Sequence, residues 1–166
     1  MQNGDSGIRL VNKGMTMTTN YGSAAELETL FSILETGWAQ RHTDISIAKP
    51  WGEKLDIDTV CKDQETGALK PYIRLSRKAA GGQPLEMGVV NVGSSGLALV
   101  DIFVPEADGA PQAALYGDEV LADFATFFQE PGPLALRSMV YTDVGPDGRG
   151  WYQGSVTVTF LRQTIY

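Results

Sequence analysis

The chain has 166 residues and a mass of 17.9 kDa, the size of one ordinary folded domain. Hydrophobic residues make up 43% of it and charged residues 20%, so a buried core is expected and intrinsic disorder is not. The formal net charge of −7 at pH 7 opposes electrostatic binding to nucleic-acid phosphates. The apolar runs are too short for a membrane span, and the first residues do not read as a signal peptide, so neither a membrane protein nor a secreted one is expected.

The N-terminal residues 1–22 contain few large apolar side chains and many Gly, Asn, Ser and Thr residues. This stretch is interpreted as an arm that either orders against a partner or contributes nothing to the fold. The single folded domain is expected over residues 23–166.

The first predicted element is a helix over residues 24–40. Ser23 followed by Glu26 has the spacing of a capping box at its start. Its apolar residues recur at helical spacing: Leu27, Leu30, Phe31, Leu34 and Trp38. Such a stripe must be buried, and in a chain of this length we expect it to pack on a sheet.

Residues 43–70 are predicted to form a short strand, marked by Ile45 and Ile47, and then a long loop. Trp51, between a proline and a glycine, suits an exposed loop anchor for a partner. The alternative is that its side chain folds back over the sheet edge. Asp56 and Asp58 are expected on one face of a strand as solvated charges.

Three further strands are predicted over residues 71–77, 86–92 and 97–104. Residues 93–96, with the sequence GSSG, are predicted as the loop of a β-hairpin between the last two. The strand over residues 97–104 is apolar on both faces, so we expect it in the middle of the sheet.

A second helix is predicted over residues 110–129, with Pro111 in its first turn and prolines at 131 and 133 to end it. Its expected buried stripe is Ala113, Gly117, Val120, Leu121, Phe124 and Phe128.

The chain is predicted to end with a second hairpin, whose strands span residues 135–142 and 151–162 around a loop at 144–150. The predicted fold class is therefore α+β, with two helices packed on one face of a mostly antiparallel sheet. The expected order of elements is a helix, three or four strands, a helix and two strands; with three strands it is α-β-β-β-α-β-β.

The only histidine and the only cysteine do not point to nucleophilic catalysis. His42 lies just after the first predicted helix, where a solvated or helix-end histidine is favoured over a catalytic one. No neighbour of Cys61 suggests a lowered thiol pKa, and no metal-ligand spacing surrounds either residue. We therefore expect no catalytic residue, no cofactor and no metal site.

Two carboxylate pairs keep general acid and base chemistry open as an alternative: Asp56 with Asp58, and Asp118 with Glu119. Asp118 and Glu119 are expected to cover the solvent side of the second helix. The glycine-rich residues 145–150 lack the Lys and Ser or Thr of a phosphate-binding loop, so a plain hairpin loop is favoured. A small α+β carboxylate enzyme is thus the less favoured reading.

Two short segments in the second half of the chain carry a family resemblance. Residues 100–106 read VDIFVPE, and residues 150–153 read GWYQ before an alternating terminal strand. With the N-terminal helix and the long second helix in the same order, the chain resembles the tail terminator family of long-tailed bacteriophages. The residue-level match is confined to residues 100–109 and 150–160. The N-terminal arm and residues 55–70 depart from the family's pattern.

The resemblance implies a structural virion protein and not an enzyme. A terminator forms a homohexameric ring that caps the tail tube, stops its polymerisation and provides the head–tail joining surface. The implied partners are other copies of the chain, the major tail tube protein and a head–tail connector protein. Assembly would occur in the host cytoplasm and place the ring at the neck-proximal end of the virion tail. Another neck or head-closure connector protein is the nearest alternative.

An acidic ring would let DNA pass through its lumen during genome ejection without specific binding. Contacts between copies are expected at loops and edges, while the helix stripes stay in the core. The candidate interface residues are Trp51, Asp143, Asp147, Arg149, Trp151 and Tyr152. For Trp151 and Tyr152, packing at the start of a strand carries equal weight.

Overall fold

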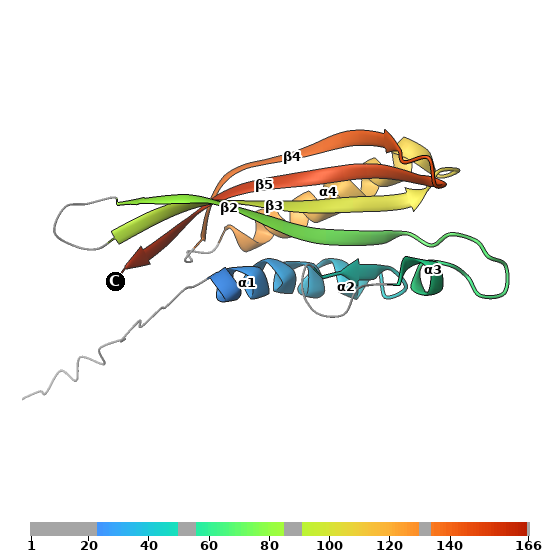
Figure 1. Cartoon of the computed structure of the whole chain (residues 1–166), viewed down its shortest axis with the longest axis horizontal. Helices are drawn as coiled ribbons and strands as arrows, with labels where there is room; N and C mark the ends of the chain where they lie inside the picture. The colour runs from blue at the N-terminus through green and yellow to red at the C-terminus, as the bar shows by residue number, and fades with distance from the viewer. Residues whose placement is uncertain (1–22, 50–55, 85–90, 130–133, 166) are drawn as a thin grey trace, which may run out of the picture.

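The computed structural model describes residues 23–49, 56–84, 91–129 and 134–165 and has an α+β fold (Figure 1), which confirms the predicted class. The elements are α1 (Ser23–Thr36), α2 (Trp38–Arg41), β1 (Ser46–Ala48), α3 (Ile57–Val60), β2 (Tyr72–Pro84), β3 (Asn91–Pro105), α4 (Gly109–Phe127), β4 (Leu134–Pro146) and β5 (Trp151–Ile165). The predicted N-terminal arm and the Trp51 loop lie outside the described residues.

The five strands form one mixed sheet in the order β1-β2-β3-β5-β4. β1 runs parallel to β2, and the other three pairings are antiparallel. β3 is the central strand and pairs with β5 along its whole length, from Asn91 opposite Ile165 to Pro105 opposite Trp151. This central place agrees with the apolar character of both faces of β3.

The predicted hairpin loop at residues 93–96 is wrong, because all four residues lie inside β3. Gly96 is needed for close packing and not for a turn: a Cβ at this position would lie 2.3 Å from the ring of Phe160. Most of the strand predicted over residues 86–92 lies outside the described residues, while Asn91 and Val92 belong to β3.

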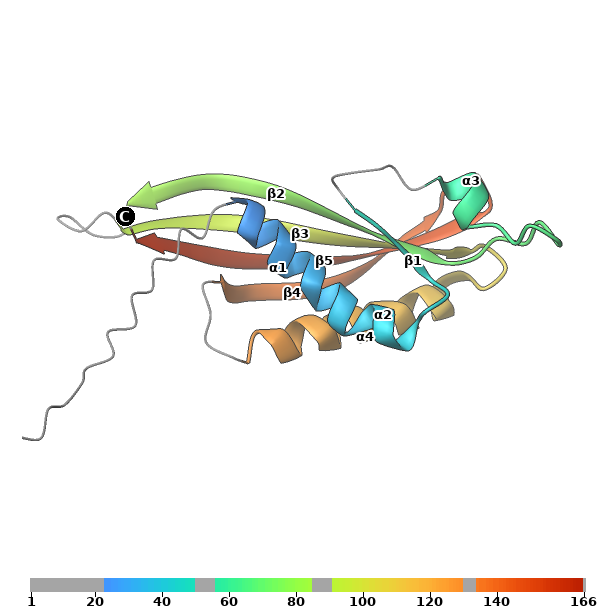
Figure 2. The ribbon, with the colours of Figure 1, turned by 90° about the horizontal axis from the view of Figure 1, so that it is seen from below.

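The main core lies between one face of the sheet and the helices α1, α2 and α4, which lie on the same side of it (Figure 2). The sheet contributes alternate residues, as the two-residue period of a strand requires. They are Ile73, Leu75, Ala98, Val100, Ile102, Val104, Val156, Val158 and Phe160. The helices contribute the predicted buried positions Leu30, Phe31, Leu34, Trp38, Ala113, Val120 and Phe124.

The first predicted helix is interrupted at Gly37, which separates α1 from α2. The backbone stays hydrogen-bonded there, since the Gly37 N–H donates to the carbonyl of Ile33 at 2.9 Å. Trp38 follows directly and is fully buried. The interruption therefore leaves the apolar stripe buried.

Glu26, in the first turn of α1, is a buried anchor. It is 1% exposed, and its carboxylate contacts Arg77 of β2 and Arg162 of β5, the latter at 3.1 Å from Nη1 to Oε2. A buried carboxylate is tolerated only when it is paired and hydrogen-bonded. The two arginines thus fix the first turn of α1 against two strands of the sheet.

The predicted loop before β2 contains the short helix α3 and covers one end of the second face of the sheet. The prediction of a strand holding Asp56 and Asp58 is wrong, because Asp56 is the N-cap of α3. Beyond α3, a bridge between Lys62 and Leu69 closes a turn. Packing there forms a second, smaller core of Cys61, Tyr72, Phe103 and Trp151, with Leu69 packed against it.

We expect Glu26→Gln to destabilise the fold by about 3 kcal/mol, because it removes the charge that compensates two largely buried guanidinium groups. Urea denaturation monitored by circular dichroism measures this free energy of unfolding. Glu28→Gln is the matched control, since Glu28 is exposed on the same helix. Equal stabilities of the two variants would contradict the anchoring role.

We expect Gly117→Ala to be destabilising by about 1–2 kcal/mol, although alanine is the better helix former. A Cβ on Gly117 of α4 would lie 2.3 Å from the ring of Tyr141 on β4. In a Tyr141→Ala background the same change should become stabilising by up to about 1 kcal/mol, because only the helix propensity remains. Urea denaturation of the four proteins tests this change of sign, and a stabilising effect in both backgrounds would refute the close packing.

Candidate interaction surfaces

The turn between β4 and β5 is held by one of the predicted interface residues. Asp147 Oδ1 accepts hydrogen bonds from the backbone N–H groups of Arg149 at 2.8 Å and Trp151 at 3.1 Å. The N–H of Glu106 donates to the carbonyl of Gly150 at 2.8 Å, which ties the turn to the end of β3. Asp147 therefore shapes the turn, and Arg149 is left as an exposed cation on it.

The other predicted interface residues are scattered. Trp151 is 5% exposed within the second core, and Tyr152 is half-buried against the main core, so both pack inside the chain. Asp143 lies within β4 and not at a loop tip as predicted, and its Oδ1 accepts a hydrogen bond from the Tyr141 hydroxyl at 2.8 Å. Trp51 lies outside the described residues.

A pocket of about 260 Å³ lies where α3, the second core and the β4–β5 turn meet. Its lining residues are Ile57, Lys62, Leu69, Tyr72, Asp147, Arg149 and Trp151. α3 exposes two large apolar side chains: Ile57, which lines this pocket, is 38% exposed, and Val60 is 45% exposed. Apolar surface beside the exposed cation Arg149 is therefore available to a partner.

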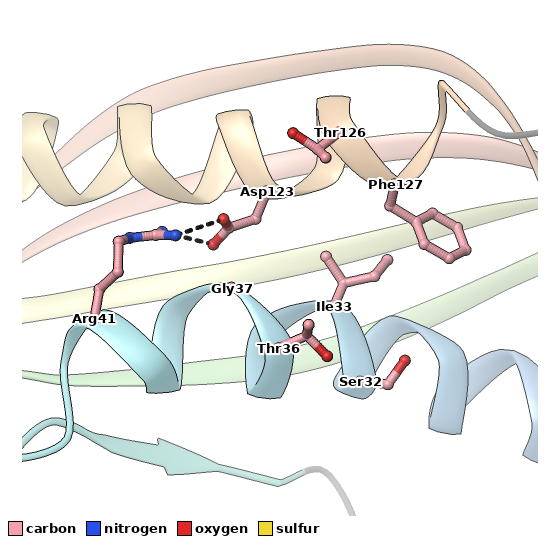
Figure 3. A pocket seen from close by; sticks show the side chains of 8 residues that line it. All are labelled: Ser32, Ile33, Thr36, Gly37, Arg41, Asp123, Thr126 and Phe127. Atoms are coloured by element: carbon pink, nitrogen blue, oxygen red, sulfur yellow. Dashed lines mark hydrogen bonds and ion pairs between the residues drawn. The ribbon is translucent and has the colours of Figure 1, made fainter.

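A second, larger cavity of about 430 Å³ lies in the cleft between α1, α2 and α4 (Figure 3). The Arg41 guanidinium spans it, donating from Nη1 and Nη2 to the two carboxylate oxygens of Asp123 at 2.9 and 2.8 Å. Gly37 leaves room for this pair, since a Cβ there would lie 2.3 Å from Asp123 Cγ. Ile33 and Phe127 supply apolar walls. The ion pair thus links α2 to α4 across the cleft.

His42 and Glu119 extend this link. His42 is the C-cap of α2, which agrees with the helix-end position expected for it. His42 is half-buried, with its ring centroid 4.2 Å from that of Trp38, and its Nε2 lies 2.5 Å from Glu119 Oε2. Glu119 is therefore not on the solvent side of α4 as predicted, unlike Asp118, which is exposed. Burial acts to raise the pKa of Glu119, but hydrogen bonds and charges from His42 and Arg41 outweigh it and lower the pKa. A carboxyl held ionised in this way is a poor proton donor near neutral pH.

Cys61 is 1% exposed in the second core, and burial, reinforced by the charge of Asp56, raises the pKa of its thiol to about 11. A neutral buried thiol is not a nucleophile. Over residues 23–49, 56–84, 91–129 and 134–165, no group of three or more His, Cys, Asp or Glu side chains is placed to hold a metal ion. No helix in that part of the chain has the length and apolarity to cross a membrane.

The outer side of α4 is a candidate interaction surface that the sequence analysis missed. Its exposed positions are Pro111, Leu115, Asp118, Ala122 and Thr126, with a single charge among them. Leu115 is 53% exposed, although a surface helix ordinarily presents charged and polar residues to solvent. The helical spacing of Leu115 and Ala122 on the side opposite the buried stripe was the available signal.

The edge strand β4 carries two more exposed apolar residues. Val140 is 51% exposed and Val144 57%. β4 is the last strand in the sheet order, so its outer edge has no strand partner among the described residues. An apolar edge of this kind is a site where another chain can pair or pack.

Comparison with known proteins shows no family: no protein-family model matches the chain, and no curated protein does. Among solved structures, one chain whose name states no function is 14% identical and aligns over 87% of this chain and 99% of its own, with a TM-score of 0.46. A likeness at this level carries no argument about function.

We expect native Cys61 to react slowly with a thiol reagent at pH 8 and quickly in urea. With the pKa raised from 9.0 to about 11, the thiolate fraction at pH 8 is roughly 100-fold lower in the folded chain. The raised pKa also gives stability that is fully present below pH 9 and is lost as the pH rises toward 11. Absorbance of the released reagent measures the rate, and Cys61→Ser is the blank. Equal rates in both states would contradict the burial.

Proposed function

We propose that this chain is a ring-forming tail terminator of a long-tailed bacteriophage. In this role copies of the chain close into a homohexamer on the last ring of the tail tube, stop its polymerisation and present the surface that joins tail to head. Its partners are then the major tail tube protein and a head–tail connector protein, at the neck-proximal end of the virion tail.

The resemblance behind this proposal concerns two segments that are far apart in sequence but paired in the sheet. Val104 lies opposite Tyr152 and Pro105 opposite Trp151, and the N–H of Glu106 donates to the carbonyl of Gly150. The VDIFVPE and GWYQ segments are thus one cross-strand unit. That two short matches belong to the same local structure supports treating them together.

The proposed self-association rests on where the exposed apolar side chains lie. The large ones in the described part of the chain are Ile57, Val60, Leu115, Val140 and Val144, and all of them lie on α3, the outer side of α4 or the edge strand β4. None of these elements is central in the sheet. Contacts at the perimeter of a subunit are what a closed ring of identical copies requires.

The charge of the chain suits the passage of DNA. A net charge of −7 per copy gives the assembled ring an acidic character, which repels phosphates. A DNA molecule can then pass through the lumen without being gripped. The proposal includes no catalytic step.

Tails made without this protein should be overlong, because tube polymerisation is not stopped, and complete tails should carry six copies of it. Electron microscopy of a phage lacking the gene product and quantitative mass spectrometry of purified tails measure the two quantities. Val140→Glu should also give overlong tails, because it places a charge on the apolar edge. Thr43→Glu, at an exposed turn position away from β4, should not.

Normal tails beside unattached heads would assign the chain to head closure instead. A copy number as high as that of the tube protein would overturn the terminator role.

A further inference from the structure

We propose that neighbouring copies meet by seating the outer stripe of α4 from one copy against the α3 pocket of the next. The inference rests on the proposed ring and names the two surfaces that close it. The donor surface is the α4 stripe around Leu115 and Asp118. The acceptor surface is the α3 pocket around Ile57 and Arg149.

The donor surface is an apolar side chain beside one anion. Leu115 is 53% exposed, and Asp118 lies one helical turn further along the same exposed stripe. The neighbouring acids of α4 are engaged within the chain, since Glu119 contacts Arg41 and His42 and Asp123 pairs with Arg41. Asp118 is therefore the charge that this side of α4 presents to a partner.

The acceptor surface has the opposite character, with an apolar side chain beside a cation. Ile57 is 38% exposed at a pocket of about 260 Å³, which the exposed Arg149 also borders. The carboxylate of Asp147, in the same lining, accepts two backbone hydrogen bonds of the turn. An apolar side chain flanked by a carboxylate fits this pocket.

The two surfaces lie on opposite sides of the sheet and cannot meet within one copy. α4 belongs to the helical layer over Ile102, whereas the pocket lies over the face that carries Phe103, the next residue of β3. A contact between different patches of identical copies is head-to-tail, and it closes into a ring when the rotation divides a full turn. Complementary charge and apolar character in one chain make a second copy the occupant.

A charge exchange tests the contact directly. Asp118→Arg and Arg149→Asp alone should each weaken self-association by at least about tenfold, because each brings like charges together across the interface. The double variant should recover association to within a few-fold of the original. Analytical ultracentrifugation, or copies per purified tail if the ring forms only on the tube, measures the effect. Circular dichroism of each single variant checks that the subunit is folded.

Leu115→Ser should weaken association without lowering the thermal stability of the subunit, because this side chain is already half in solvent. Failure of the double variant to recover, or full assembly of both single variants, would overturn the proposed contact and leave the terminator role standing. Tails of normal length in the absence of the protein would instead remove the terminator role. If the charge exchange restores self-association in a ring that has another function, the proposed contact still holds.

Discussion

β3 carries apolar side chains on both faces, and each face therefore needs a cover. Ile102 faces the helical layer of α1, α2 and α4, while the next residue, Phe103, faces the second core. Burying large apolar side chains is the main favourable term in folding. Other segments of the chain therefore pack on both faces of this strand. The segment with Cys61 and Leu69 serves the second side and thereby places α3 beside the β4–β5 turn.

Several arginines of this acidic chain pair with buried or half-buried carboxylates. Glu26 forms ion pairs with Arg77 and Arg162. Asp101 forms one with Arg74, whose Nη2 lies 2.7 Å from Asp101 Oδ2. A buried or half-buried carboxylate left without a partner is costly, which accounts for this use of arginine.

The interaction surfaces follow from this arrangement. α4 buries one stripe in the main core, yet its opposite side is also weakly polar, with Leu115 and Ala122 among the exposed positions. A helix of that composition is typical of an element covered on two sides. The α3 pocket owes its exposed cation Arg149 to the turn held by Asp147. Local hydrogen bonds thus decide which side chains the proposed ring neighbour would meet.

Sequence periodicity alone determined the α+β class, both long helices with their buried stripes, and the terminal strands, because each rests on neighbours along the chain. Only the tertiary structure decided the rest. Gly96 was mistaken for a turn because its partner, the ring of Phe160, is distant in sequence, and the burial of Glu26 was missed because its arginines lie on β2 and β5. Trp151 faces the core and not solvent because Phe103 and the segment before β2 pack around it. Local patterns predict which residues are buried. Which side chains cover them depends on packing between segments that are distant in sequence.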